Sequence, residues 1–261
     1  MPEGVPVWGL TTMAGEIYLL RLAKLDVYDA NTYSFQRSLA VPNARRIVDI
    51  TSCKHYRCVY LSDHDSECVR RLDVQGSIKQ WPVNDRPWQL SVNTEHNVIV
   101  NCRYACKVKE FGSNGEPLRE LTLPDDIANP LHVIQTGSGQ FIVCHGDHGD
   151  QQHRVCMVTA DGRHIVHSHG GCWGSDTGQY YVPNHLAVDD NEFVFVADIN
   201  NRRVTLLSPT LEYVRQLVSP DQLNWMPVRL CLDTERRRLY VAVNKLMLGV
   251  WTAGRVVVFN V

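Results

Sequence analysis

Residues 183–204 read PNHLAVDDNEFVFVADINNRRV. The apolar stretches LAV and FVFVA are separated by the acidic segment DDNE, and the polar segment DINN leads to a further apolar run at residues 204–207. Short runs rich in Val, Phe and Leu that are bounded by Asp and Asn are typical of strands joined by tight turns. This segment therefore predicts a unit of antiparallel strands.

The same pattern recurs along the chain. It returns at residues 87, 130 and 227, each time at a proline, and weaker copies begin near residues 7 and 45. The first core positions of the six copies are Leu10, Val48, Leu90, Val133, Leu186 and Leu230. A period of about 40–45 residues with several short strands per unit is typical of propeller blades. We therefore predict an all-β fold, a six-bladed β-propeller of four-stranded antiparallel blades, in a single domain covering residues 1–261, with an insertion between residues 144 and 182.

The last copy ends at residues 255–261, which would form its third strand. An unpaired strand edge invites association with other chains, so something must cover it. We expect residues 2–5 to supply the missing outer strand and close the ring.

Composition limits the classes of function. The net charge is −2, whereas nucleic-acid binders usually carry a basic excess. No apolar run approaches the length of a membrane span, and the first ten residues lack the features of a secretory signal. Nine cysteines without a CxxC pair favour buried thiols in a reducing compartment. We expect a cytoplasmic protein, monomeric as an isolated domain and not bound to membranes.

The segment at residues 183–204 strongly resembles the NHL repeat, and the chain resembles a six-bladed NHL β-propeller over nearly its whole length. The resemblance implies a ring whose top face binds proteins, peptides or RNA, often at the C-terminus of tripartite-motif proteins. The Asp-x4-Arg pair of the repeat is kept at Asp198 and Arg203, where we expect a structural clasp within the blade. Its equivalents elsewhere are Asp63 with Cys68 and Val243 with Arg255. The chain holds no RING, B-box or coiled-coil segment, so ubiquitin-ligase activity is not expected of it.

A candidate binding rim follows from the ring symmetry. The residue two positions after each proline equivalent precedes the innermost strand, so the six equivalents should meet at one channel mouth. They are Gly9, Ile47, Gln89, His132, His185 and Arg229. Trp88 adds a large aromatic side chain of the kind enriched at binding hot spots. The predicted partner-binding residues are Trp88, Arg229, Gln89, His132 and His185, with Arg45, Arg86 and Arg202 on an outer rim.

Histidines and acids offer a weaker case for catalysis. Seven of the eleven histidines lie between His132 and His169, and imidazoles can bind zinc. They cluster in one copy, whereas ligands for a metal on the axis should come from several blades. The equivalent repeat positions also show no ring of acids. We therefore expect no catalytic residue, no metal and no cofactor. A metal-dependent lyase or lactonase is the less favoured alternative.

Short arginine runs leave a second binding class open. Runs occur at residues 45–46, 70–71, 202–203 and 236–238, and Trp8, Trp81, Trp88 and Trp225 are available for stacking. RNA binding needs such groups on one face. Because the runs fall at different places in the repeat, we expect them to point to different faces. The sequence predicts a non-enzymatic module that binds a protein or peptide, with RNA as the alternative.

Overall fold

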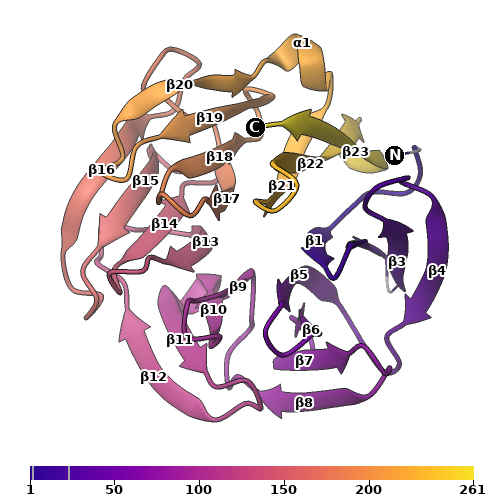
Figure 1. Cartoon of the computed structure of the whole chain (residues 1–261). Helices are drawn as coiled ribbons and strands as arrows, with labels where there is room; N and C mark the ends of the chain where they lie inside the picture. Colours follow the sequence, from indigo (N-terminus) through magenta and orange to yellow (C-terminus); the bar gives the residue numbers. More distant parts are fainter. Residues whose placement is uncertain (2, 23) are drawn as a thin grey trace.

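Six antiparallel sheets surround a central axis in the computed structural model, which describes residues 1, 3–22 and 24–261 (Figure 1). Five sheets have four strands and the sixth has three. The innermost strands are β1 (Gly9–Met13), β5 (Ile47–Cys53), β9 (Leu90–Val92), β13 (Pro130–Gln135), β17 (Pro183–Val188) and β21 (Met226–Asp233). The prediction of a six-bladed β-propeller is confirmed, and so is the three-stranded last blade.

The remaining strands follow in chain order toward the periphery. The second strands are β2 (Glu16–Arg21), β6 (Cys58–Asp63), β10 (Val98–Cys102), β14 (Phe141–His145), β18 (Val194–Asp198) and β22 (Arg238–Met247). The third strands are β3 (Lys24–Asp29), β7 (Cys68–Asp73), β11 (Lys107–Phe111), β15 (Gln152–Val158), β19 (Arg203–Leu207) and β23 (Val250–Asn260). The outer strands are β4 (Phe35–Ala40), β8 (Ile78–Pro82), β12 (Pro117–Thr122), β16 (Ile165–Cys172) and β20 (Tyr213–Val218).

Burial follows this order from the axis outward. Strands β6, β10, β14 and β18 are buried at every residue, because each lies within a sheet that is covered on both faces by neighbouring blades. The outer strands β4 and β12 are largely exposed. Within residues 1, 3–22 and 24–261, helix is limited to the single turns η1 (Arg103–Ala105) and α1 (Pro220–Leu223). No helix of the described residues is long and apolar enough to cross a membrane.

A shared bulge fixes the equivalence of the blades and corrects one predicted alignment. The register shifts between Pro130 and His132 in β13, and in the same way at the starts of β17 and β21. In β5 the shift falls between Ile47 and Asp49. Asp49 is therefore the equivalent of His132, and Ile50 is the equivalent core residue. The predicted alignment of the second copy was therefore two residues too early, with Ile47 taken for Asp49 and Val48 for Ile50.

A basic side chain ties each blade to the segment that enters its innermost strand. In the fifth blade the predicted Asp198–Arg203 clasp is present, with Nε 2.9 Å from Oδ2 and Nη1 donating to the Ser175 carbonyl at 2.8 Å. Donors to the corresponding segments of the other blades are Arg21 to Val5, Arg70 to Asn43, Lys109 to Val83, Arg154 to Asp126 and Arg255 to Leu223. Two of the four arginine runs, at residues 70–71 and 202–203, thus contribute to these structural contacts.

The second blade keeps the clasp with its arginine displaced. Asp63 lies opposite Cys68 in the strand register, as expected. Its ion-pair partner is Arg70, whose Nε lies 3.0 Å from Oδ2. Arg70 is two residues further along β7, and alternate residues of a strand share a face. The clasp was missed because the sequence interpretation held the spacing fixed.

The N-terminal segment lies along the free edge of the last blade. Gly4 and Gly254 exchange two backbone hydrogen bonds of 3.0 and 2.8 Å, and the Met1 amino group donates to the Val256 carbonyl at 3.0 Å. Figure 1 places the N-terminus beside β23. The predicted closure by residues 2–5 takes the form of an isolated antiparallel bridge rather than a strand, and residue 2 lies outside the described residues. The buried Asn244 side chain completes the seam by bonding both the amide and the carbonyl of Val7 at 2.9 Å.

Deleting residues 1–5 should lower the melting temperature. The deletion removes the Gly4–Gly254 pair of hydrogen bonds and the Met1 contact, each worth about 1 kcal/mol net. A loss of about 2–3 kcal/mol corresponds to a fall of several degrees in a chain of this size. Thermal unfolding followed by circular dichroism measures the change. Gly254→Ala should act in the same direction, because its Cβ would lie 2.4 Å from Asn244 Oδ1. An unchanged melting temperature for both variants would contradict this closure.

Candidate functional site

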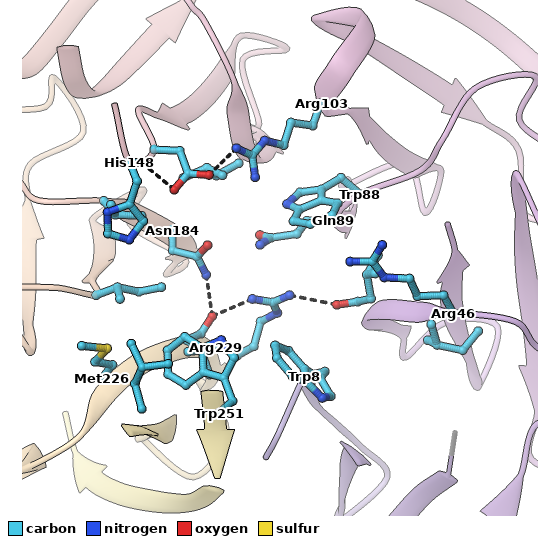
Figure 2. Close-up of a pocket in the computed structure, with 18 of the residues that line it drawn as sticks. Trp8, Arg46, Trp88, Gln89, Arg103, His148, Asn184, Met226, Arg229 and Trp251 are labelled. Carbon is cyan, nitrogen blue, oxygen red and sulfur yellow. Dashed lines mark hydrogen bonds and ion pairs between the residues drawn. The ribbon is translucent and has the colours of Figure 1, made fainter. Parts of the chain in front are cut away.

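A cavity of about 900 Å³ opens at the end of the ring where the innermost strands begin (Figure 2). Its walls come from the segments that enter those strands and from hairpins between second and third strands. The entering segments contribute Trp8, Ala44, Arg45, Arg46, Ile47, Val48, Trp88, Gln89, Leu131, Val182, Asn184, Met226, Val228 and Arg229. The hairpins and neighbouring residues contribute Leu22, Arg103, Asp147, His148, Ile199, Asn200, Leu246, Gly249 and Trp251. A cavity of this size lies in the range of ligand pockets.

Arg229 forms the floor of the cavity and joins blades that are not neighbours. Its Nε lies 2.8 Å from Oδ1 of Asp49, and both side chains are buried. Nη2 donates to the Val48 carbonyl at 2.9 Å, while Nη1 donates to the Val228 carbonyl at 2.8 Å. Figure 2 shows the Arg229 guanidinium in the middle of the cavity, with hydrogen bonds on two sides. The side chain therefore crosses from β21 to β5, past the equivalent position of β1, which is occupied by Gly9.

Gly9 allows β1 to lie close to its neighbour. A Cβ at this position would lie 2.7 Å from Cγ1 of Ile50 and 3.0 Å from its amide nitrogen. A side chain here would therefore push β1 away from β5. Gly9 was predicted as a rim residue, and the structure shows that its role is this close approach.

Gln89, His132 and His185 are also buried and polar, and with Arg229 and Asp49 they form a ring of hydrogen-bonded side chains below the cavity, here called the polar belt. With its oxygen toward Arg229 Nη1 at 3.2 Å, the Gln89 amide donates to the carbonyls of Leu131 and Asn184. Nδ1 of His132 accepts from the Leu186 amide at 3.1 Å, and Nε2 lies 3.2 Å from the Leu90 carbonyl. His185 accepts from the Leu230 amide at 3.3 Å and stacks on His132, with ring centroids 4.0 Å apart. These contacts link the innermost strands of successive blades.

Burial fixes the charge states in this belt. It lowers the pKa of His132 to about 3 and the pKa of His185 well below its usual value, and the nearby Arg229 charge acts in the same direction. Complete burial raises the pKa of Asp49, while Arg229 and the Leu90 amide oppose that rise. Both imidazoles are therefore neutral at pH 7. A neutral ring suits the pattern observed at His132, in which Nδ1 accepts a hydrogen bond and Nε2 is left to donate one.

Asp49, His132 and His185 form the one group in the described part of the chain whose ligand atoms could hold a metal ion. One such atom from each lies within 4.8 Å of the others. The Asp49 carboxylate is already bound by the Arg229 cation, and both nitrogens of His132 face backbone groups. A metal ion would have to displace those bonds beside a positive charge. The donor set therefore fits a buried structural belt better than a metal centre.

An aromatic cluster packs around Trp88, which lines one wall of the cavity. The rings of Trp88, His64 and Tyr104 meet edge to face at centroid distances of 5.7–6.1 Å. The guanidinium of Arg103 lies 5.2 Å from the Trp88 ring and forms an ion pair with Asp147. Buried atoms without a hydrogen-bond partner include Nε1 of Trp88 and Nε of Arg103. Two donors thus remain unused on this wall, which is unusual for buried polar groups.

The second blade presents two arginines at the rim. The Asp63 carboxylate accepts hydrogen bonds from the backbone amides of Arg45 and Arg46, at 3.2 and 3.0 Å. These hydrogen bonds fix the backbone of Arg45 and Arg46, while the side chains of both residues are exposed and line the cavity. Arg46 lies 4.0 Å from Asp65, a half-exposed ion pair that contributes little. Asp63, which also binds Arg70, thereby positions the rim arginines.

The structure brings part of the predicted site together. Trp88, Gln89, Arg229 and Arg45 line the cavity, whereas Arg86 and Arg202 are exposed outside its walls. His132 and His185, also predicted for the rim, are buried, do not line the cavity and hold backbone groups between blades. Of the tryptophans considered for stacking, Trp8 lines the cavity, while Trp81 is buried in a core cluster and Trp225 packs beneath Arg255.

Several functional candidates were missed. Asp49 was hidden by the misaligned second copy. Arg103, Met226 and Trp251 line the cavity from a hairpin, the start of β21 and the long β23, where the repeat pattern gives no signal. Arg46 stands in a noted arginine run but was not selected. Asp147 is identified by its ion pair with Arg103, a contact between two hairpins that the sequence does not show.

Comparison with known proteins gives a fold and no family. No protein-family model matches the chain, and no curated protein matches its sequence. Solved structures do match. A protein of unknown function from Bacteroides caccae has a TM-score of 0.64 at 15% identity, covering 87% of this chain and 86% of that one. Hydrazine synthase from Kuenenia stuttgartiensis has a TM-score of 0.66 at 13% identity, covering 98% and 96%.

Virginiamycin B lyase from Staphylococcus aureus is a third similar structure. Its TM-score is 0.65 at 11% identity, and the match covers 100% of this chain and 88% of that one. Identities this low show a shared fold and carry no activity from one protein to the other. The chain is a six-bladed β-propeller with the architecture of these proteins.

Proposed function

We propose that the chain is an NHL-type propeller that acts as a non-enzymatic module, binding a protein or peptide partner in the cavity at its channel mouth. The observation that carries this proposal is the cavity itself. Trp8, Trp88 and Trp251 line it together with Met226 and three leucines, beside four arginines. Aromatic and Met side chains are enriched in the cores of protein interfaces. We retain a cytoplasmic location as part of the proposal, since all nine cysteines are free.

Catalysis is the weaker alternative. One similar structure is a catalytically inactive histidine-to-alanine form of virginiamycin B lyase with quinupristin. In this chain His132 and His185 are buried away from the cavity wall, and their hydrogen bonds to the backbone occupy them. Among the described residues, the imidazole on the wall is that of His148, which is exposed. The wall also lacks a hydrogen-bonded nucleophile and base, which covalent catalysis requires.

RNA is the other alternative, and the arginines argue against it. Arg70 and Arg203 are buried in ion pairs with Asp63 and Asp198. Arg236 pairs with Asp233, and Arg238 donates to the Ala30 carbonyl. Of the four runs, residues 45–46 are the one that lines the cavity. Strong RNA binding needs many free cations along one path.

Trp88→Ala should reduce partner capture by about 30-fold. Truncating a central interface tryptophan typically costs about 2 kcal/mol or more. Quantitative pull-down from lysate, with nuclease and at two salt concentrations, measures the change. Trp173→Ala is the matched control, because Trp173 is 60% exposed and does not line the cavity.

A second variant, at an exposed position, tests the same wall in case Trp88→Ala fails to fold. Leu246→Asp adds a charge at an exposed position of the wall and should also weaken capture. If proteins captured by the wild type are retained by both wall variants, the partner binds elsewhere. If nuclease or moderate salt removes all binding, RNA replaces protein as the ligand.

A further inference from the structure

Positive charge is concentrated on one side of the cavity. Its walls hold Arg45, Arg46, Arg103 and Arg229, against the single acid Asp147. Arg103 is paired with Asp147 and Arg229 with the buried Asp49. Arg45 and Arg46 have no close acid on the cavity wall, and Asp65 contacts Arg46 only at 4.0 Å. The mouth of the ring is therefore cationic although the whole chain has a net charge of −2.

Unused hydrogen-bond donors lie on the same side. Nε1 of Trp88 and Nε of Arg103 are buried without a partner among the described residues. Arg229 has five N–H groups, and its bonds to Asp49, Val228, Val48 and Gln89 use four of them. One Nη2 hydrogen remains. These groups can only donate, so the complementary ligand must offer oxygen acceptors.

The opposite side is apolar. The Trp8 and Trp251 rings meet edge to face, with centroids 6.3 Å apart at an interplanar angle of 86°. Met226 adds a flexible apolar side chain, and Leu22 and Leu246 stand exposed at the edge. Figure 2 shows Met226 and Trp251 on one side of the Arg229 guanidinium, and Trp88 and Arg46 on the other. A ligand that fits both sides must carry an anionic group next to a bulky apolar group.

We propose that the cavity recognises a peptide segment in which an Asp or Glu side chain stands next to a bulky apolar side chain. This inference rests on the proposed function and names the chemistry of the partner. The carboxylate would lie against the exposed guanidinium groups of Arg45 and Arg46, beside Trp88. The apolar side chain would lie against Trp8, Trp251 and Met226. A carboxylate held by arginine gains charge-assisted hydrogen bonds.

The geometry favours a peptide over a nucleic acid. Base binding requires flat aromatic faces that are open to stacking. Trp8 and Trp251 pack edge to face, so the edge of one ring covers the face of the other. The Trp88 ring is covered by the Arg103 guanidinium at 5.2 Å. Two free arginines also make a short path for a phosphate backbone, whereas they suffice for one carboxylate.

A random decapeptide library with blocked termini tests the proposal. The immobilised propeller should enrich peptides that contain Asp or Glu beside Phe, Trp, Leu, Ile or Met. For an enriched peptide, replacing the acid by its amide should weaken binding at least tenfold. The Arg45→Gln/Arg46→Gln double variant should bind the acid and amide forms equally. Arg215→Gln is the matched control, because Arg215 is exposed on the outer strand β20, away from the cavity.

The outcomes separate this inference from the proposed function. Peptides that bind the wild type but not Trp88→Ala, without a preference for acids, would overturn the inference and leave peptide binding at the mouth intact. Binding of poly(U) that the Arg45→Gln/Arg46→Gln variant loses, with no peptide enriched over Trp88→Ala, would overturn both and establish RNA as the ligand. If neither peptides nor poly(U) bind at the mouth, both proposals fail.

Discussion

Arg229→Ala is expected to lower the free energy of unfolding by about 3–5 kcal/mol, the usual cost of removing one partner of a buried ion pair. The variant would leave the Asp49 carboxylate fully buried without its counter-ion. It would also remove the bonds that join the Val48 and Val228 carbonyls across the ring. Because unfolding free energies are typically 5–15 kcal/mol, this is a large fraction of the total. Urea unfolding followed by circular dichroism measures it.

Two companion variants distinguish the unpaired charge from a loss of packing. Asp49→Leu/Arg229→Met removes both charges and should recover much of the stability, since apolar replacement of a whole buried pair is often neutral. Arg46→Ala changes an exposed arginine of the same cavity and should alter stability by less than about 0.5 kcal/mol. A cost below 1 kcal/mol for Arg229→Ala would contradict a structural role for the pair.

This expected cost also changes how the binding site is tested. A loss of binding in Arg229→Ala would be ambiguous, because the fold would be weakened at the same time. Arg45 and Arg46 are better positions, since their amides are fixed by Asp63 while their side chains are exposed. Arg229 lies at the floor of the cavity, where it holds Asp49 and the Val48 and Val228 carbonyls in place and has one unused N–H group. The rim arginines and Trp88 therefore carry the functional tests.

The fold was predictable because each blade repeats the same local chemistry. Proline entry, two apolar runs and a polar turn between them mark the copies that begin at residues 87, 130, 183 and 227. The second copy lacks the proline, so its bulge could not be located and Asp49 was assigned no role. The strand register places the bulge between Ile47 and Asp49, and this shifts the alignment of the second copy by two residues.

The cavity was only partly predictable, for a different reason. Trp88, Gln89 and Arg229 occupy repeat positions, so the ring symmetry points to them. Arg103 comes from a 3-10 turn whose equivalent residues in two other blades are His64 and Ile199, so the repeat does not predict an arginine there. Trp251 comes from a long hairpin of the last blade. The histidines at the predicted rim are buried in the protein instead of lining the cavity. A neutral imidazole can be buried there because its two nitrogens can bond backbone groups of two strands, as those of His132 do. Symmetry thus placed the positions at the mouth without deciding which side chains face it.

Acidification from pH 7 to pH 5 is expected to cost several kcal/mol of stability. Burial lowers the pKa of His132 to about 3 and of His145 to about 4, and it lowers that of His185 well below 6.5. A histidine whose pKa is lower in the folded state binds its proton mainly after unfolding. Its stabilising effect is therefore complete above about pH 6.5 and decreases as the pH falls toward the folded value. Each such group costs about 1.4 kcal/mol per pH unit within that window.

The geometry explains why these rings resist protonation. Arg154 donates to Nε2 of His145 at 3.3 Å, so a protonated His145 would face a guanidinium. His132 accepts from the Leu186 amide, and protonation of that nitrogen would break the bond between the fourth and fifth blades. Asp49 and Asp198 act in the opposite sense, because burial raises their pKa values. The net loss should therefore be smaller than the sum over the three histidines.

Urea unfolding at half-unit steps between pH 7 and pH 5 gives the slope directly. His132→Gln keeps one acceptor and one donor but cannot take up a proton, so its stability should fall less steeply with acid than that of the wild type. His167→Gln, which changes an exposed imidazole on β16, should leave the slope unaltered. A slope in His132→Gln equal to that of the wild type would mean that acid sensitivity arises elsewhere in the ring. A stability that rises on acidification would show that the buried carboxylates outweigh the histidines.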